Sequence, residues 1–303
     1  MGLPVYASPL ERIWYYTFRV ICALIFLFLM APILIIIPLS FNAEPYFTFT
    51  QKMLSFDPTG YSTRWYDLLL TFGMENPDVA RDRSWWSDVW ENAAWVRATK
   101  NSIIIGFFST ILATGLGTLA ALGLSRPEMP YRRAIMAVLI SPMIVPIIIT
   151  ATGLFFFYST TGLANSYPGI ILAHATLGIP FVIITVTATL VGFDHSLTKA
   201  AASLGATPSR TFFKIIMPLI LPGVISGALF AFVTSFDEVV VVLFIADFDQ
   251  QTIPRQMWNG IREQISPAIL SVATILVIFS TLLLTTMELL RRRSERLRGM
   301  APH

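Results

Sequence analysis

The sequence is poor in charge and almost without cysteine. Charged residues make up 13% of the 303 positions, against about 25% in a typical globular domain, whereas 55% of the residues are hydrophobic. The single cysteine, Cys22, excludes an internal disulfide. The small net charge of +3 gives no reason to expect a nucleic-acid partner. This composition predicts an all-α polytopic membrane protein.

The chain also lacks the motifs of common catalytic and nucleotide-binding sites. It contains no G-x-x-x-x-G-K-[ST] phosphate loop, so it is not an ATPase of that type. Neither His174 nor His195 has a second ligand at a convincing metal-site spacing. No nucleophile, base and acid stand in a recognisable arrangement. We therefore expect no catalytic residue, metal or cofactor on this chain, and we expect His174 to be a packed side chain.

Six apolar stretches have the length of about 20 residues that crosses a bilayer. They are Val20–Phe41, Ser102–Leu124, Ala134–Ser159, Gly169–Val191, Leu219–Ala246 and Pro267–Leu290. The first is too long for the apolar region of a signal peptide, and no A-x-A-like site follows it, so we expect it to be retained. Pro142 and Pro146 lie inside the third stretch and predict a kink or break there.

The distribution of Lys and Arg predicts the orientation. With both termini in the cytoplasm, 13 of the 21 basic residues fall on the cytoplasmic side, including the run Arg291–Arg293. The predicted organisation is a cytoplasmic N-terminus (1–19), a first span (20–41), an extracytoplasmic loop (42–100), a core with five spans (101–290) and a basic cytoplasmic tail (291–303).

Five of the seven tryptophans lie in the extracytoplasmic loop 42–100. The stretch SWWSDVWENAAWVRATKNS (84–102) has helical spacing and leads into the second span. Its tryptophans suit an interfacial helix at the lipid headgroups. A docking surface for an extracytoplasmic partner is the alternative, and the two interpretations are compatible.

A polar segment, residues 194–218, interrupts the apolar spans. We expect Ser196 to cap an alanine-rich helix and Gly205 to end it in a left-handed conformation. Thr207 followed by Pro208 predicts the start of a second helix. The product is a helix-turn-helix knob that could dock into another protein. An ordinary linker is the alternative, although such order is unusual in a linker of about 20 residues.

This segment resembles the EAA motif of permease subunits in bacterial ABC importers. That motif has E-A-A, three residues, Gly, nine residues and then I-x-L-P. Here Lys199 stands in place of the acidic residue and Met217 in place of the leucine. The residues that we assign to the knob on this resemblance are Lys199, Ala200, Ala201, Gly205, Ala206, Phe212, Ile215, Met217 and Pro218.

The resemblance implies a type I ABC importer permease fold with six transmembrane helices and cytoplasmic coupling helices, in the bacterial inner membrane. It implies two ATPase subunits that bind ATP and Mg²⁺, a second permease subunit that we expect to be non-identical, an extracytoplasmic solute-binding protein, and contact with lipid. Within this family the chain is most similar to the spermidine/putrescine type, in the stretches FNAEPYFTF, GYSTRWY and FDEVVV. Related permeases move opines, amino-acid derivatives, organophosphonates or iron.

Asp237 and Glu238 are ionisable residues inside an apolar run. Such groups are costly in a membrane and usually face a pathway or a partner. We therefore propose Asp237, Glu238 and the nearby Ser235 as candidates for lining a pathway for a cationic solute. An internal hydrogen bond or an ion pair with another subunit is equally compatible with the sequence.

Two other classes of protein are weighed against the permease. A self-contained secondary transporter should show an internal repeat and a charged relay, and the sequence has no evident repeat. A membrane enzyme should show a nucleophile, a metal cluster or a cofactor motif, which we do not find.

Overall fold

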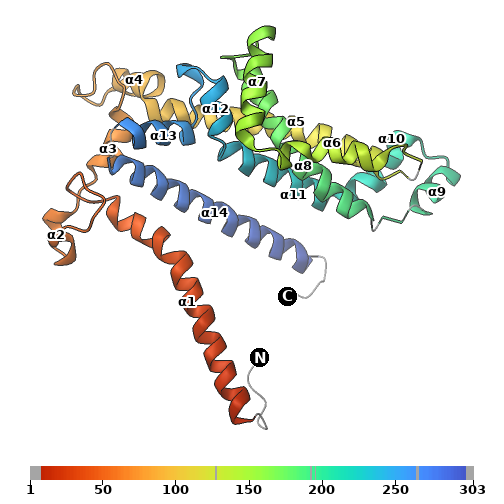
Figure 1. Ribbon diagram of the computed structural model, residues 1–303, viewed down its shortest axis with the longest axis horizontal. Coiled ribbons are helices and arrows are strands. Elements are labelled where there is room, and N and C mark those ends of the chain that lie inside the picture. The colour runs from red at the N-terminus through yellow and green to blue at the C-terminus, as the bar shows by residue number, and fades with distance from the viewer. Residues whose placement is uncertain (1–7, 127, 192, 195, 264–265, 298–303) are drawn as a thin grey trace. The chain divides into compact units, whose positions relative to one another are not determined.

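Figure 1 shows the computed structural model, which describes residues 8–126, 128–191, 193–194, 196–263 and 266–297. The ends of the predicted N-terminus (1–7) and tail (298–303) lie outside the described residues. The chain divides into two compact units, one formed by the segments up to 72 and from 260 onward, the other by 73–259. The described secondary structure is helical, apart from an isolated antiparallel bridge between Asn42 and Tyr61.

The first unit is built on two long helices. Its elements are α1 (Pro9–Leu39), α2 (Gln51–Leu54), the 3-10 turn η1 (Pro58–Gly60), α3 (Arg64–Thr71) and α14 (Ala268–Leu297). Helix α1 begins at a capping box, in which the Ser8 hydroxyl accepts the N–H of Glu11 and the Glu11 carboxylate accepts the N–H of Ser8. This cap starts the helix 11 residues before the predicted apolar stretch.

The far end of α1 is tied to α3 and α14 by buried polar side chains. The Ser40 hydroxyl lies 2.7 Å from the Tyr66 hydroxyl, and the Ser271 hydroxyl donates to the Ser40 carbonyl at 3.3 Å. The Trp65 indole N–H donates to the Asn42 carbonyl at 2.7 Å. These bonds satisfy the backbone where the chain turns out of α1.

The second unit holds the remaining helices. They are α4 (Arg83–Asn92), α5 (Ala94–Leu124), α6 (Arg132–Ile144), α7 (Ile147–Thr161), α8 (Tyr167–Val191), α9 (Ser196–Ser203), α10 (Pro208–Thr211), the π-helical turn η2 (Phe212–Ile216), α11 (Met217–Phe236), α12 (Val240–Ile245) and the 3-10 turn η3 (Phe248–Gln250). Helix α13 (Ile253–Glu263) begins in this unit and ends in the first.

Helices α5, α8 and α11 pack against one another and form the core of the second unit (Figure 1). Small residues allow this close approach. A Cβ atom built on Gly178 of α8 would lie 2.9 Å from Cβ of Ala231 on α11 and 3.1 Å from Cβ of Ala113 on α5. Small residues at helix contacts are typical of membrane bundles, where dispersion contacts stabilise helix association.

The described residues contain four helices that are long and apolar enough to cross a membrane, or five if α6 and α7 together count as one span. Helices α6 and α7 meet at 100°, with the break at Val145 and Pro146. This confirms the predicted break in the third apolar stretch. In the sixth stretch, α14 runs from Ala268 to Leu297, and its apolar part within the described residues is Ala268–Leu282. The described residues do not confirm the predicted number of six.

Two helix ends differ from the ends of the predicted apolar stretches. Helix α5 already begins at Ala94, inside the expected loop, and only Ala93 separates it from α4. The fifth stretch is not one helix to Ala246: α11 ends at Phe236, and α12 is a separate short helix. In addition, α14 continues through the first residues of the predicted tail to Leu297.

We predict that Gly178→Val destabilises the protein by about 1–3 kcal/mol, because the added side chain overpacks the three-helix core. Gly115→Val on α5 is the matched control: it introduces the same residue into a helix, but a Cβ at Gly115 meets nothing within 4 Å. Thermal unfolding midpoints in detergent test this. Equal midpoints for the two variants would contradict the packing argument.

Candidate functional site

The segment 194–218 folds as two short helices joined by a tight turn. Helix α9 begins at Ser196, which is therefore its first residue and not its cap, contrary to the prediction. The Asp194 carboxylate accepts both the Ser196 N–H, at 2.8 Å, and the Ser196 hydroxyl, at 2.7 Å. Its two oxygens can satisfy both donors, so the serine hydroxyl serves as a donor here.

Gly205 ends α9 as predicted. Its φ of +77° is left-handed, a conformation in which glycine meets no Cβ clash. Its N–H bonds to the carbonyl of Ala202 at 2.9 Å, and the N–H of Ala206 bonds to the carbonyl of Ala201 at 3.0 Å. These two bonds form a Schellman motif, which satisfies the last carbonyls of the helix and fixes the direction of the turn.

The second helix begins at the predicted cap. The Thr207 hydroxyl accepts the Arg210 N–H, and Pro208 occupies the first helical position. The helix then passes through the π-turn η2 directly into α11, so that Pro208–Phe236 forms a continuous helical stretch of 29 residues. A displacement of the turn at Gly205 would therefore act directly on a membrane-spanning helix.

The predicted knob residues fall into three classes of exposure. The exposed ones are Lys199, Ala200, Gly205 and Pro218, and the half-buried ones are Ala206, Phe212, Ile215 and Met217. Ala201 is buried. Leu204 beside the turn is 88% exposed, and Phe213 is 67% exposed. Leu204 lies at the turn and Phe213 in the first turns of the following helix; exposed apolar side chains of this size suit a contact with another protein.

Asp237 and Glu238 lie in the break between α11 and α12, not in the middle of a helix as predicted. Asp237 is exposed, whereas Glu238 is buried. The Glu238 carboxylate accepts the N–H of Val241 at 2.9 Å, near the start of α12. The break could not be predicted from the sequence, because no proline or glycine marks it within the apolar run. Instead, the Glu238 carboxylate accepts the backbone N–H that the end of the helix leaves free. Of the two carboxylates, Asp237 is therefore the exposed one.

Ser235 is 4% exposed and lies inside the three-helix core, away from any surface of this chain. Its hydroxyl lies 2.8 Å from Nδ1 of His174 on α8 and 2.9 Å from the hydroxyl of Ser109 on α5. This chain of hydrogen bonds joins all three core helices. His174 is thus a packed side chain, as expected, and it also has a polar role that the sequence does not reveal.

A second polar cluster, centred on Asn101, was not predicted. The Asn101 amide donates to the carbonyls of Asp249 and Gln251 at 2.7 and 2.8 Å, and its oxygen accepts from the Tyr167 hydroxyl at 2.7 Å. The Ser102 hydroxyl accepts the N–H of Ile253 at 2.9 Å. This cluster holds the irregular segment after α12 against α5 and α8. An asparagine at the edge of an apolar stretch was the available signal.

Among the residues that the structure describes, no three His, Cys, Asp or Glu side chains are placed to hold a metal ion. What the second unit does provide is a packed helical core, an interrupted helix with an exposed carboxylate, and an ordered knob with exposed apolar side chains. This combination is typical of a helical membrane protein that contacts other proteins.

Comparison with known proteins gives the family. The chain belongs to the family described as "Binding-protein-dependent transport system inner membrane component", which matches residues 113–297. It is therefore a multi-pass inner-membrane permease component and not a catalytic subunit. The transport systems of this family also contain a solute-binding protein and an ATPase.

Curated relatives cover nearly the whole chain. The spermidine/putrescine transport system permease protein PotC of Haemophilus influenzae is 29% identical over 271 residues, 89% of this chain and 95% of that protein. The putrescine transport system permease protein PotI of Escherichia coli K12 is 30% identical over 284 residues, 91% of this chain and 88% of that protein.

A solved structure supports the fold. A chain of a bacterial ABC transporter involved in the import of the acidic polysaccharide alginate superposes with a TM-score of 0.70, covering 94% of this chain and 99% of that chain at 16% identity. At this identity the likeness concerns the fold alone. The fold is that of a type I ABC importer permease, as the sequence predicted.

We predict that Ser235→Ala destabilises the protein by about 1–3 kcal/mol, because it leaves Nδ1 of the buried His174 without a partner. Ser159→Ala is the control, since the Ser159 hydroxyl is exposed and bonds within its own helix. Thermal unfolding in detergent measures both. Loss of solute uptake by Ser235→Ala at wild-type stability would instead support the predicted pathway role of Ser235.

Proposed function

We propose that this chain lines half of the pathway of an ATP-driven importer and that segment 194–218 is the site at which an ATPase subunit docks. The observation that carries the proposal is the continuous helix Pro208–Phe236, which joins the exposed turn at Gly205 to a membrane-spanning helix. The resemblance to the EAA motif and the exposed Leu204 and Phe213 support it.

The mechanism follows from rigid-body movement. Two partner ATPase subunits bind ATP and Mg²⁺ and close on each other, and each carries a docked knob with it. The Schellman turn transmits this displacement to α10, and the unbroken helix carries it to α11. Because α11 packs tightly against α5 and α8, the core moves as one body and changes the side to which the pathway opens. ATP hydrolysis lets the two ATPase subunits separate, and this separation returns the permease subunit to its starting conformation.

The knob then lies in the cytoplasm, and so do both termini. A solute-binding protein delivers solute on the opposite side. A second permease subunit supplies the other half of the pathway, and we propose that it is non-identical to this chain, as the resemblance to the polyamine type implies.

We propose a polyamine or a related organic cation as the solute. The names of the relatives PotC and PotI support this, and so does the chemistry at the break after α11. Asp237 is exposed there, as the C-cap of α11, where the helix dipole places partial negative charge. A carboxylate and a helix C-terminus together favour a cation. Opines, amino-acid derivatives, organophosphonates and iron are the other solutes carried by similar permeases.

We predict that Gly205→Val uncouples transport from ATP hydrolysis without preventing membrane insertion. The left-handed backbone at Gly205 disfavours a branched side chain by about 1–2 kcal/mol, although the surrounding space is open. Gly205→Asn is the control, because asparagine tolerates this conformation. Uptake and solute-stimulated ATPase activity are measured in the reconstituted complex. Normal values for Gly205→Val would rule out the coupling role.

We predict that Asp237→Asn lowers the uptake of a cationic solute by about tenfold, which corresponds to about 1.4 kcal/mol, at normal expression. Glu238→Gln is the control, since glutamine keeps an acceptor for the Val241 N–H and Glu238 is buried. It should transport nearly as well as the wild type. Normal uptake by Asp237→Asn would exclude Asp237 as a cation-pathway residue, while leaving the coupling proposal intact.

A further inference from the structure

Helix α4 is fixed rigidly to the start of the membrane-spanning helix α5. The Asp82 carboxylate caps α4 by accepting the N–H groups of Ser84 and Trp85. At its other end, Ala93 alone separates α4 from α5, and Ala93 is fully buried. A one-residue joint without exposure leaves little freedom, so α4 stays at the depth that α5 gives it.

The length of α5 sets that depth. Its 31 residues extend about 46 Å at 1.5 Å per residue, whereas the hydrocarbon core is about 30 Å thick. The ends of α5 therefore reach into the headgroup region. Its first turns contain Arg97 and Lys100, and the continuous apolar run begins only at Ile103. Helix α4 joins these turns and so precedes the apolar run of α5.

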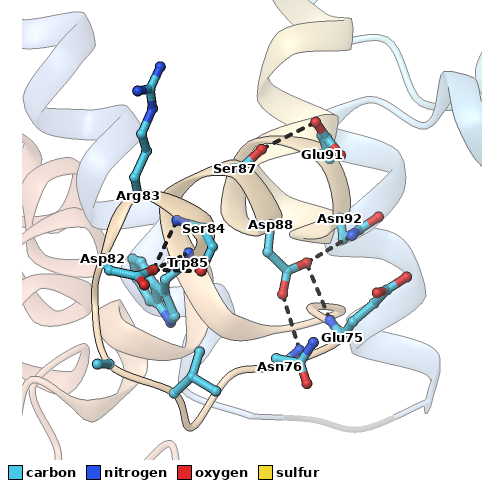
Figure 2. Close-up of a pocket in the computed structure, with 12 residues that line it drawn as sticks. Glu75, Asn76, Asp82, Arg83, Ser84, Trp85, Ser87, Asp88, Glu91 and Asn92 are labelled. Carbon is cyan, nitrogen blue, oxygen red and sulfur yellow. Dashed lines mark hydrogen bonds between the residues drawn. The ribbon is translucent and has the colours of Figure 1, made fainter.

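Helix α4 presents three distinct faces. Trp85 and Val89 are 1% and 4% exposed and face the protein interior. A second face lines a pocket of about 1000 Å³, and the residues that α4 contributes to it include Arg83, Ser87, Asp88 and Glu91 (Figure 2). The third face carries Trp86 and Trp90, which are one helical turn apart and 54% and 61% exposed.

The Asp88 carboxylate on the pocket face forms its hydrogen bonds within the protein. Asp88 accepts the N–H groups of Glu75 and Asn76 and the side-chain amide of Asn92 (Figure 2). The Asn92 hydrogen bond, followed by that of Asn76, lowers the pKa of Asp88 and keeps it ionised. Asp88 thereby holds the preceding loop against α4, on the side away from the exposed tryptophans.

The charge in contact with the exposed tryptophans is positive. The Lys100 ammonium lies 4.5 Å from the centre of the Trp90 ring and donates to the Trp90 carbonyl. Exposed indoles in contact with a cation match the lipid interface, where phosphates lie beside the start of the acyl chains.

We propose that the face formed by Trp86 and Trp90 is a membrane anchor that lies in the phospholipid headgroup region, with Lys100 beside the lipid phosphates. The pocket face of α4 then points to water. The anchor fixes the height of α5 in the bilayer. This inference does not depend on the solute or on the coupling role of segment 194–218. It depends only on the chain spanning a membrane.

The test uses the full chain in vesicles of ordinary phospholipid or of the same lipid brominated near the top of the acyl chains. The fluorescence that is lost on Trp86→Phe/Trp90→Phe is obtained by difference from the wild type. We expect brominated lipid to quench this component about twofold, because bromine quenches an indole at the interface by contact. Acrylamide in the water should quench it weakly. Trp85→Phe is the matched control, since its buried indole should respond little to either quencher.

The opposite pattern would overturn the proposal. If acrylamide quenches the Trp86 and Trp90 component and brominated lipid does not, the face is directed to water and is available to an extracytoplasmic protein. The measurement is made on folded protein and needs no transport activity, so it stands even if the double variant transports poorly.

Discussion

Backbone N–H and C=O groups must find partners inside the protein wherever the chain is removed from water, and this constraint governs the breaks on both sides of α12. Where α11 gives way to α12, the Glu238 carboxylate accepts the N–H of Val241. After α12, the Asn101 amide takes up the carbonyls of Asp249 and Gln251. The chain can therefore leave the helical conformation beside a packed core without leaving these groups unpaired.

Close packing of α5, α8 and α11 is the second condition for function. Gly178 lets the three helices approach until backbone and Cβ atoms touch, and Ser235 links His174 and Ser109 across all of them. Closely packed interiors deform little and so transmit displacement. A core of this kind can be moved as a unit by a force applied at one helix, which a loosely packed bundle could not.

The sequence predicted those features that depend on neighbouring residues. Apolar length located the membrane helices, Pro146 marked the break between α6 and α7, and Gly205 with Thr207 and Pro208 defined the turn of the knob. The break at Glu238 was missed because the apolar run continues through it without proline or glycine. The remaining errors concern partners distant in sequence: the position of Ser235 depends on a histidine 61 residues away, and the Asn101 contacts span 148 and 150 residues.

In the proposed mechanism, the turn at Gly205 must move, whereas the start of α5 must stay at a fixed height in the membrane. A force applied at Gly205 changes the side to which the pathway opens only if some part of the core resists translation. A subunit that moved as a whole along the membrane normal would keep the pathway open to the same side. Trp86 and Trp90 on α4 would provide that resistance at the start of α5, since withdrawing an indole from the interface is unfavourable. With α11 driven and α5 held, the packed core can respond by tilting, and tilting exchanges access between the two sides of a membrane.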